Sequence, residues 1–72
     1  MKLIRKVSIG VDYKNSMHFV VGQEVLDKSY SIDYIKNTID GIEIWIKKAN
    51  ELVLWKSFNK AVPVVIEYNI DF

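Results

Sequence analysis

The sequence predicts a small all-β domain, an antiparallel meander of five or six strands that forms a barrel or a strongly coiled sheet. Two observations support this fold class. Apolar and polar residues alternate with the two-residue period of half-buried strands over most of the 72 residues. Turn-forming residues also separate these alternating runs at short intervals. Closure into a barrel would remove the exposed edges that the long final strand would otherwise present.

Composition restricts the chain to a single domain over residues 1–72. Half of the residues are hydrophobic, 26% are charged and the net charge is +1, a balance too apolar for a disordered chain. No apolar run reaches the roughly 18 residues of a membrane helix. Lys2 and Arg5 interrupt the N-terminal apolar residues too early for a signal peptide. We therefore expect a cytoplasmic protein with no membrane partner.

The first two strands are predicted on either side of a polar turn at 12–16. One face of the first strand carries Leu3, Val7, Ile9 and Val11. Arg5 is the exception to that pattern. After the turn the alternation resumes at Met17, Phe19 and Val21. Gly22 indicates a bulge or a bend, and residues 26–29 indicate the next connection.

The segment 30–39 fits two secondary structures. Tyr30, Ile32 and Tyr34 alternate as in a strand, whereas isoleucines at 32, 35 and 39 also have helical spacing. A short helix would be capped by Ser31 and would end before Gly41. The many β-branched and aromatic residues favour a strand with a bulge near Asp33–Tyr34.

Two hairpins are predicted next. Asp40-Gly41 favours a two-residue turn, which would place Ile35 opposite Ile46 and Lys36 opposite Trp45. A three-residue loop at 48–50, with Asn50 in the left-handed conformation, would then pair Ile46 with Leu52, Ile44 with Leu54, and Trp45 with Val53. A long alternating strand over 62–72 follows, with Pro63 near its start.

This register predicts an unusually apolar outer face. Its inner residues are Ile42, Ile44, Ile46, Leu52 and Leu54. Its outer residues, the candidate partner-binding set, are Trp45, Trp55, Val53, Lys36, Lys47 and Glu43. Tryptophan is enriched at binding hot spots, and Lys36 is expected on or near the Trp45 ring. Two other hypotheses stay open. A loop or a terminus covers the rings, or the strand register differs by one residue, which would exchange the two faces.

Catalytic and cofactor-binding patterns are absent from the sequence. There is no cysteine, so disulfides and thiol chemistry are excluded, and one histidine disfavours a structural zinc site. No serine has a nucleophile-elbow context and the glycines are isolated. His18 is expected to be a surface or hydrogen-bonded strand residue. We expect a protein that is not an enzyme and needs neither cofactor nor metal.

Three kinds of partner remain open: a foreign protein, a second copy of the chain, and single-stranded nucleic acid. Small barrels bind single strands through exposed aromatic rings with flanking cations. The rings available for this are Tyr13, Tyr30, Tyr34, Trp45 and Trp55. Ten basic residues are nearly offset by nine acidic ones, so the charge balance favours a protein partner.

Three stretches, at 12–25, 54–58 and 64–70, resemble the short accessory proteins of T4-type bacteriophages. The similarity also includes chain length, Lys/Ile/Asn usage and the absence of cysteine. The resemblance implies an early phage product that acts in the bacterial cytoplasm by binding and inhibiting a host protein. It carries no residue pattern, so it assigns no role to any individual position.

Overall fold

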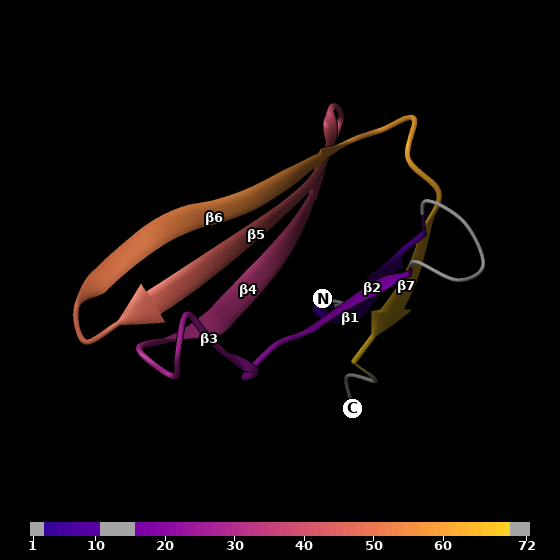
Figure 1. Cartoon of the computed structure of the whole chain (residues 1–72). Helices are drawn as coiled ribbons and strands as arrows, with labels where there is room; N and C mark the ends of the chain where they lie inside the picture. The colour runs from indigo at the N-terminus through magenta and orange to yellow at the C-terminus, as the bar shows by residue number, and fades with distance from the viewer. Residues whose placement is uncertain (1–2, 11–15, 70–72) are drawn as a thin grey trace.

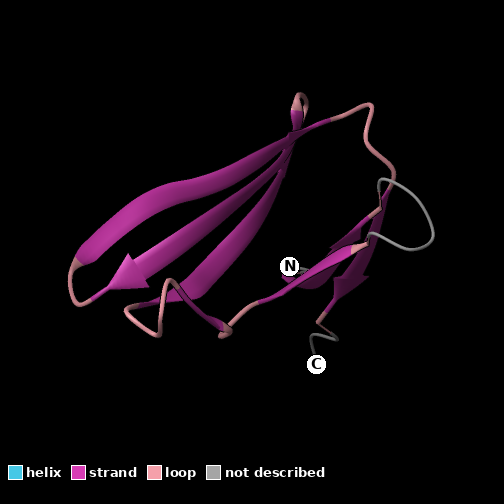
Figure 2. Ribbon diagram, viewed as in Figure 1, coloured by secondary structure: helices cyan, strands magenta, loops and turns pink. Residues whose placement is uncertain are grey.

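A computed structural model describes residues 3–10 and 16–69 of the chain. This part of the chain contains seven strands: β1 (Ile4–Ile9), β2 (Met17–Val20), β3 (Glu24–Val25), β4 (Tyr30–Thr38), β5 (Gly41–Lys48), β6 (Glu51–Asn59) and β7 (Val64–Tyr68). The ribbon consists of strands and connecting loops (Figure 2). Within it there is no helix long and apolar enough to cross a membrane. The predicted all-β fold is confirmed.

The strands form two antiparallel sheets, with the orders β2-β1-β7 and β3-β4-β5-β6. The four-stranded sheet curls as a half-barrel beside the three-stranded one (Figure 1). The chain passes from one sheet to the other between β2 and β3. Gly22 makes the bend there with φ +94°, and its N–H bonds to the Ile32 carbonyl at 2.8 Å. This bend divides the expected second strand in two, so the chain has more strands than the five or six predicted.

The core lies between the inner faces of the two sheets. Its buried side chains are Val7, Ile9, Phe19, Val25, Ile32, Ile35, Ile42, Ile44 and Ile46. An aromatic cluster joins the sheets at one side. The Phe19 ring on β2 lies 5.9 Å from Trp55 and 5.7 Å from Phe58, both on β6. Burial of these apolar groups is the main stabilising contribution, since the chain has no cysteine for a disulfide and its described residues form no helix.

The first strand departs from simple alternation at Arg5. The pairing of β1 with β7 shifts register between Ile4 and Lys6, so Arg5 occupies a bulge. Ile4 packs against the core in consequence, whereas Leu3 is 59% exposed instead of buried as expected. The guanidinium of Arg5 forms an ion pair with Glu67 at 2.7 Å. Val11, the turn at 12–15 and the strand end at 70–72 lie outside the described residues.

Residues 30–38 form a strand, and the predicted bulge lies where expected. The register between β4 and β5 shifts between Ile32 and Tyr34, which leaves Asp33 unpaired and exposed. The bulge brings Ile32 and Ile35 to the same buried side although they are three residues apart. The helical spacing of the isoleucines therefore reflects a bulged strand.

The β4–β5 turn contains Ile39-Asp40, so the prediction that Asp40-Gly41 forms the loop was wrong. Thr38 pairs with Gly41, and the Thr38 Oγ1 accepts hydrogen bonds from the N–H groups of Asp40 and Gly41 at 3.2 and 3.1 Å. Ile35 consequently lies opposite Ile44 instead of Ile46. A displacement by two residues leaves each side chain on its predicted face.

The β5–β6 turn contains Ala49-Asn50, one residue fewer than predicted. Lys48 pairs with Glu51, and Ala49, not Asn50, has the positive φ, at 52°. Val53 therefore lies opposite the buried Ile46, and Leu54 lies opposite Trp45. The one-residue difference exchanges the two faces of β6.

The pairing of β5 with β6 has a bulge at Trp55. The partner of Trp45 is Leu54 and the partner of Ile44 is Lys56, which leaves Trp55 unpaired. Beyond the bulge Ser57 is exposed and Phe58 is half-buried. Among the described strands, β6 pairs only with β5, and β7 pairs only with β1. The two strands leave the Asn59–Pro63 connection in different directions (Figure 1), so the sheet is an open half-barrel.

Candidate interaction surface

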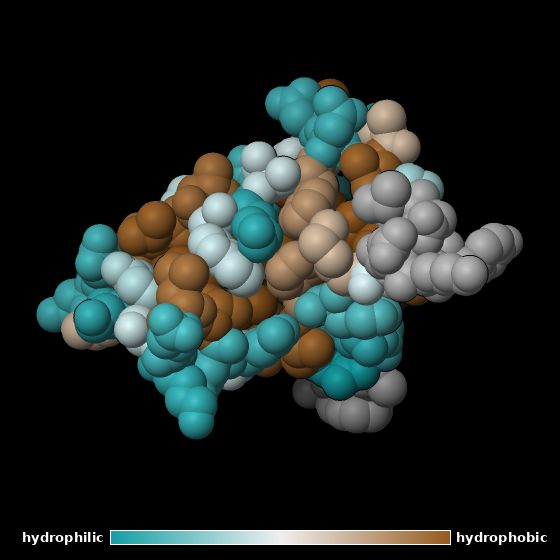
Figure 3. All heavy atoms as spheres, viewed as in Figure 1, coloured by the Kyte–Doolittle hydropathy of each residue, from teal (hydrophilic) through white to brown (hydrophobic). Residues whose placement is uncertain are grey.

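The outward face of the β4–β5–β6 sheet carries four large apolar side chains, which we call the outer patch: Tyr34, Trp45, Leu52 and Leu54. Trp45 lies between Tyr34 on β4 and Leu54 on β6, its cross-strand partners. Leu52 follows one row along, opposite Lys47. Tyr34, Leu52 and Leu54 are 37%, 46% and 42% exposed. Figure 3 shows apolar side chains at the surface over the region of these strands.

The two rings of the outer patch hold each other in place. Tyr34 and Trp45 are stacked with 5.7 Å between ring centroids and an interplanar angle of 7°. The indole Nε1–H of Trp45 donates to Glu43 Oε1 at 3.2 Å. A stacked neighbour and a hydrogen bond on the ring edge restrict the rotamers of Trp45, so little side-chain entropy remains to be lost on binding.

Charged side chains border the outer patch. Lys36 and Glu43 form the neighbouring cross-strand pair at one side, and Lys47 lies at the other. Both lysines are exposed. The expectation that Lys36 lies opposite Trp45 was wrong, because Tyr34 takes that position. An apolar centre with a charged rim is the usual composition of a protein–protein contact surface.

Trp55 and Val53, also predicted for the outer face, lie on the opposite side of the sheet. Both are half-buried against the core, and Trp55 contacts Phe19 edge-on at an interplanar angle of 86°. The Lys56 Nζ lies 4.8 Å from the centroid of the Trp55 ring. The predicted set is thus divided: Trp45, Lys36, Lys47 and Glu43 share the outer face, and the other two contribute to the core.

Leu52 and Leu54 were predicted inside, and Tyr34 was not among the predicted binding residues. The exposure of the two leucines follows from the length of the β5–β6 turn. Lys48-Ala49-Asn50-Glu51 is compatible with a two-residue turn as well as a three-residue loop. The shorter turn exchanges the inner and outer faces of β6. The charges beside the turn do not distinguish the two. The shorter turn places Lys48 opposite Glu51 and the longer one would place Lys47 there, so both give an opposite-charge cross-strand pair.

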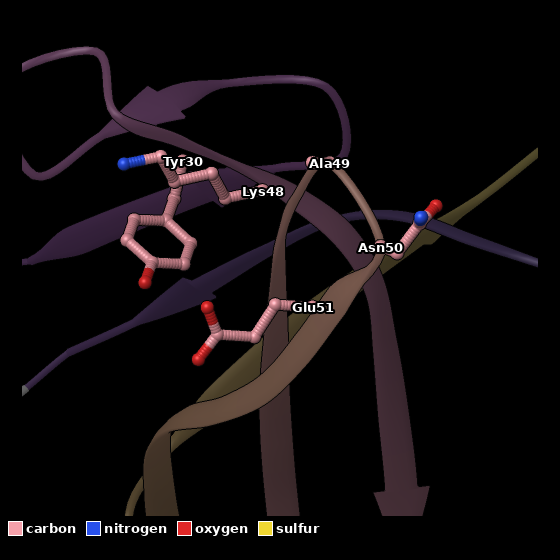
Figure 4. A pocket seen from close by; sticks show the side chains of 5 residues that line it. All are labelled: Tyr30, Lys48, Ala49, Asn50 and Glu51. Atoms are coloured by element: carbon pink, nitrogen blue, oxygen red, sulfur yellow. The ribbon is translucent and has the colours of Figure 1, made fainter.

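An open pocket lies at the end of the β5–β6 hairpin, lined by Tyr30, Lys48, Ala49, Asn50 and Glu51. Figure 4 shows the Lys48 side chain passing beside the Tyr30 ring, with Asn50 directed away from it. The Lys48 Nζ lies 5.8 Å from the ring centroid. The contact is a cation–π interaction that packs the hairpin end against the start of β4.

The described residues contain no group of three or more His, Cys, Asp or Glu side chains that could hold a metal ion. His18 is exposed on β2, and its Nδ1 lies 2.8 Å from the Ser8 Oγ, as expected for a hydrogen-bonded strand residue. Glu67, the acidic residue of β7, is engaged by Arg5 and by Lys6. These polar contacts link neighbouring strands at the surface.

Comparisons of the chain with protein-family models, curated proteins and solved structures found no match. The resemblance to phage accessory proteins therefore stays a prediction.

Proposed function

We propose that this chain is a non-enzymatic binding protein that occludes a surface of a partner protein through its outer patch. The observation that carries the proposal is the exposure of Tyr34, Leu52 and Leu54 around a fixed tryptophan, on the sheet face turned away from the core. Such a face carries polar side chains when it only meets water. A contiguous exposed apolar group bordered by charges is typical of an interaction site.

Energetic considerations support a rigid contact. Tryptophan and tyrosine bury large areas with few rotatable bonds, and both are frequent at hot spots. The sheet beneath the outer patch is held by buried isoleucines at 42, 44 and 46, so the patch stays in one geometry when free. A preorganised surface loses less free energy to ordering when a partner docks.

The rim favours a protein over nucleic acid as the partner. Lys36 lies directly opposite Glu43, and Lys47 is separated from Lys36 by the apolar row of Tyr34 and Trp45. The outer face therefore has no continuous basic stripe to follow a phosphate backbone. The stacked rings also cover one face of each other, which reduces the ring area on which bases can stack. If the phage resemblance holds, the partner is a protein of the bacterial host.

Capture from a bacterial lysate tests the proposal. The immobilised chain is expected to retain a host protein after nuclease treatment, because the contact is apolar and depends weakly on salt. Leu54→Ser should lose this protein, whereas Ile39→Ser should retain it, since Ile39 is 83% exposed in the β4–β5 turn and outside the outer patch.

Two outcomes would contradict the proposal. Capture that disappears with nuclease, and weakens steeply with added salt, would indicate nucleic-acid binding. Equal capture by Leu54→Ser and the unmodified chain, with unchanged thermal stability, would show that the partner docks elsewhere.

A further inference from the structure

One edge of β6 pairs with no described strand, and its side chains follow a symmetric order. Over residues 51–60, exposed and half-buried side chains follow the same order when read in either direction. The centre of this palindrome lies between Trp55 and Lys56, at the bulge. In a regular strand two neighbouring side chains point to opposite faces, so a centre of symmetry cannot lie between two inward-facing neighbours. The bulge places Trp55 and Lys56 on the same face and so creates this centre.

We propose that two copies of the chain pair through β6, antiparallel and about a two-fold axis between Trp55 and Lys56. In this register residue i lies opposite residue 111 − i of the second copy. Val53 then meets Phe58 on the inner side, and Leu54 meets Ser57 on the outer side. In every pair the two side chains point to the same side of the sheet, as directly opposite residues of an antiparallel sheet must.

The charges at the two ends of residues 51–60, the first residue of β6 and the one that follows its last, agree with this register. Glu51 lies opposite Lys60 of the second copy, and the two-fold axis repeats the pair at the other end. Both residues are exposed, and within the described chain neither forms an ion pair. The net charge of +1 adds little repulsion between copies.

The bulge favours a second copy over another strand as the occupant of this edge. A bulged edge pairs poorly with a regular strand, which is one way in which proteins prevent edge-to-edge association. A second β6 has the same irregularity at the same place, so the two bulges face each other on the axis. The inward side chains of β6 are half-buried because the strand is an edge, and Val53 and Phe58 of each copy would cover one another.

The pairing makes one continuous eight-stranded sheet from the two β3–β4–β5–β6 sheets. It leaves the outer patches exposed and adjacent, so it does not depend on the proposed function and does not compete with it. The contact is of the small class that gives weak, concentration-dependent dimers.

Sedimentation or light scattering over a range of concentrations reaching the millimolar tests the proposal. The chain should pass from monomer to dimer, and Lys60→Glu should weaken the dimer roughly fivefold or more, because two attractive pairs become repulsive. The double variant Glu51→Lys with Lys60→Glu should restore the dimer. Thermal unfolding of each variant controls for the changed Lys48–Glu51 pair of the hairpin.

Cross-linking tests the register itself. The chain has no cysteine, so a single one can be introduced cleanly. In the proposed dimer the two copies of residue 57 lie about 11 Å apart, from three residues along the strand and one strand spacing across. A short bis-maleimide should therefore join copies of Ser57→Cys and should not join copies of Ser29→Cys, an exposed site in the β3–β4 turn. A monomer at every concentration, or a dimer insensitive to Lys60→Glu and not linked through residue 57, would overturn the proposal.

Discussion

Replacement of Gly41 by alanine is expected to lower the free energy of unfolding by about 3 kcal/mol or more. Gly41 has φ +149°, and a Cβ built on it would lie 1.8 Å from the backbone oxygen of Phe58. The obstructing atom is backbone, so relief requires β6 to move away from β5. A domain of this size has a total stability of roughly 4–11 kcal/mol, so much of the chain would be unfolded at moderate temperature.

Chemical and thermal denaturation followed by circular dichroism measures this effect. Gly22→Ala is the matched control, because Gly22 also has a positive φ, at 94°, but a Cβ there would meet no atom within 4 Å. We expect the control to lose about 1–2 kcal/mol, from backbone strain alone. Equal losses in the two variants would contradict the close approach of β5 and β6 at Gly41.

The two tryptophans are expected to have opposite roles, which gives the second large effect. Trp45→Ala should weaken the affinity for the captured partner by roughly 30-fold or more, as for a central hot spot. It should reduce stability by only about 1 kcal/mol, since the ring packs on a surface neighbour, Tyr34. Trp55→Ala should reduce stability by about 2–3 kcal/mol, because it removes the edge contact with Phe19.

Titration with the partner and denaturation of the free chain separate these roles. Trp55→Phe is the conservative control, and it should keep both the partner affinity and most of the stability. A Trp45→Ala variant that binds normally, or a Trp55→Ala variant with unchanged stability, would contradict the assignment of the two faces.

The faces of β4 and β5 could be predicted from the sequence because alternation is insensitive to errors of two residues. The β4–β5 turn was placed incorrectly, yet Ile35, Ile44 and Trp45 all lie on their predicted sides. The bulge at Asp33 was also predictable, because the change of spacing between Ile32 and Ile35 has no other explanation in a strand. At Gly22, by contrast, a bulge or a bend was predicted, but not that the chain passes there from one sheet to the other.

The faces of β6 could not be predicted with the same security. They depend on whether the preceding loop has two or three residues, and each choice gives an alternating strand. With leucine at 52 and 54, valine at 53 and tryptophan at 55, both faces of β6 are apolar, so hydrophobicity alone does not select one. The contact of Trp55 with Phe19 decides the choice, and it joins residues from different sheets. Such long-range packing has no signature in a local pattern.

Docking of a partner on the outer patch is measured most directly by a titration of the ¹⁵N-labelled chain with the captured partner, following the two indole N–H resonances. The outer patch carries Trp45, and the aromatic cluster of the core carries Trp55. We expect the Trp45 resonance to shift or broaden, because its ring and its bond to Glu43 lie in the contact, while the Trp55 resonance stays in place. A shift of the Trp55 resonance with Trp45 unchanged would contradict docking on the outer patch, since the partner would then dock on the side of the sheet that faces the core.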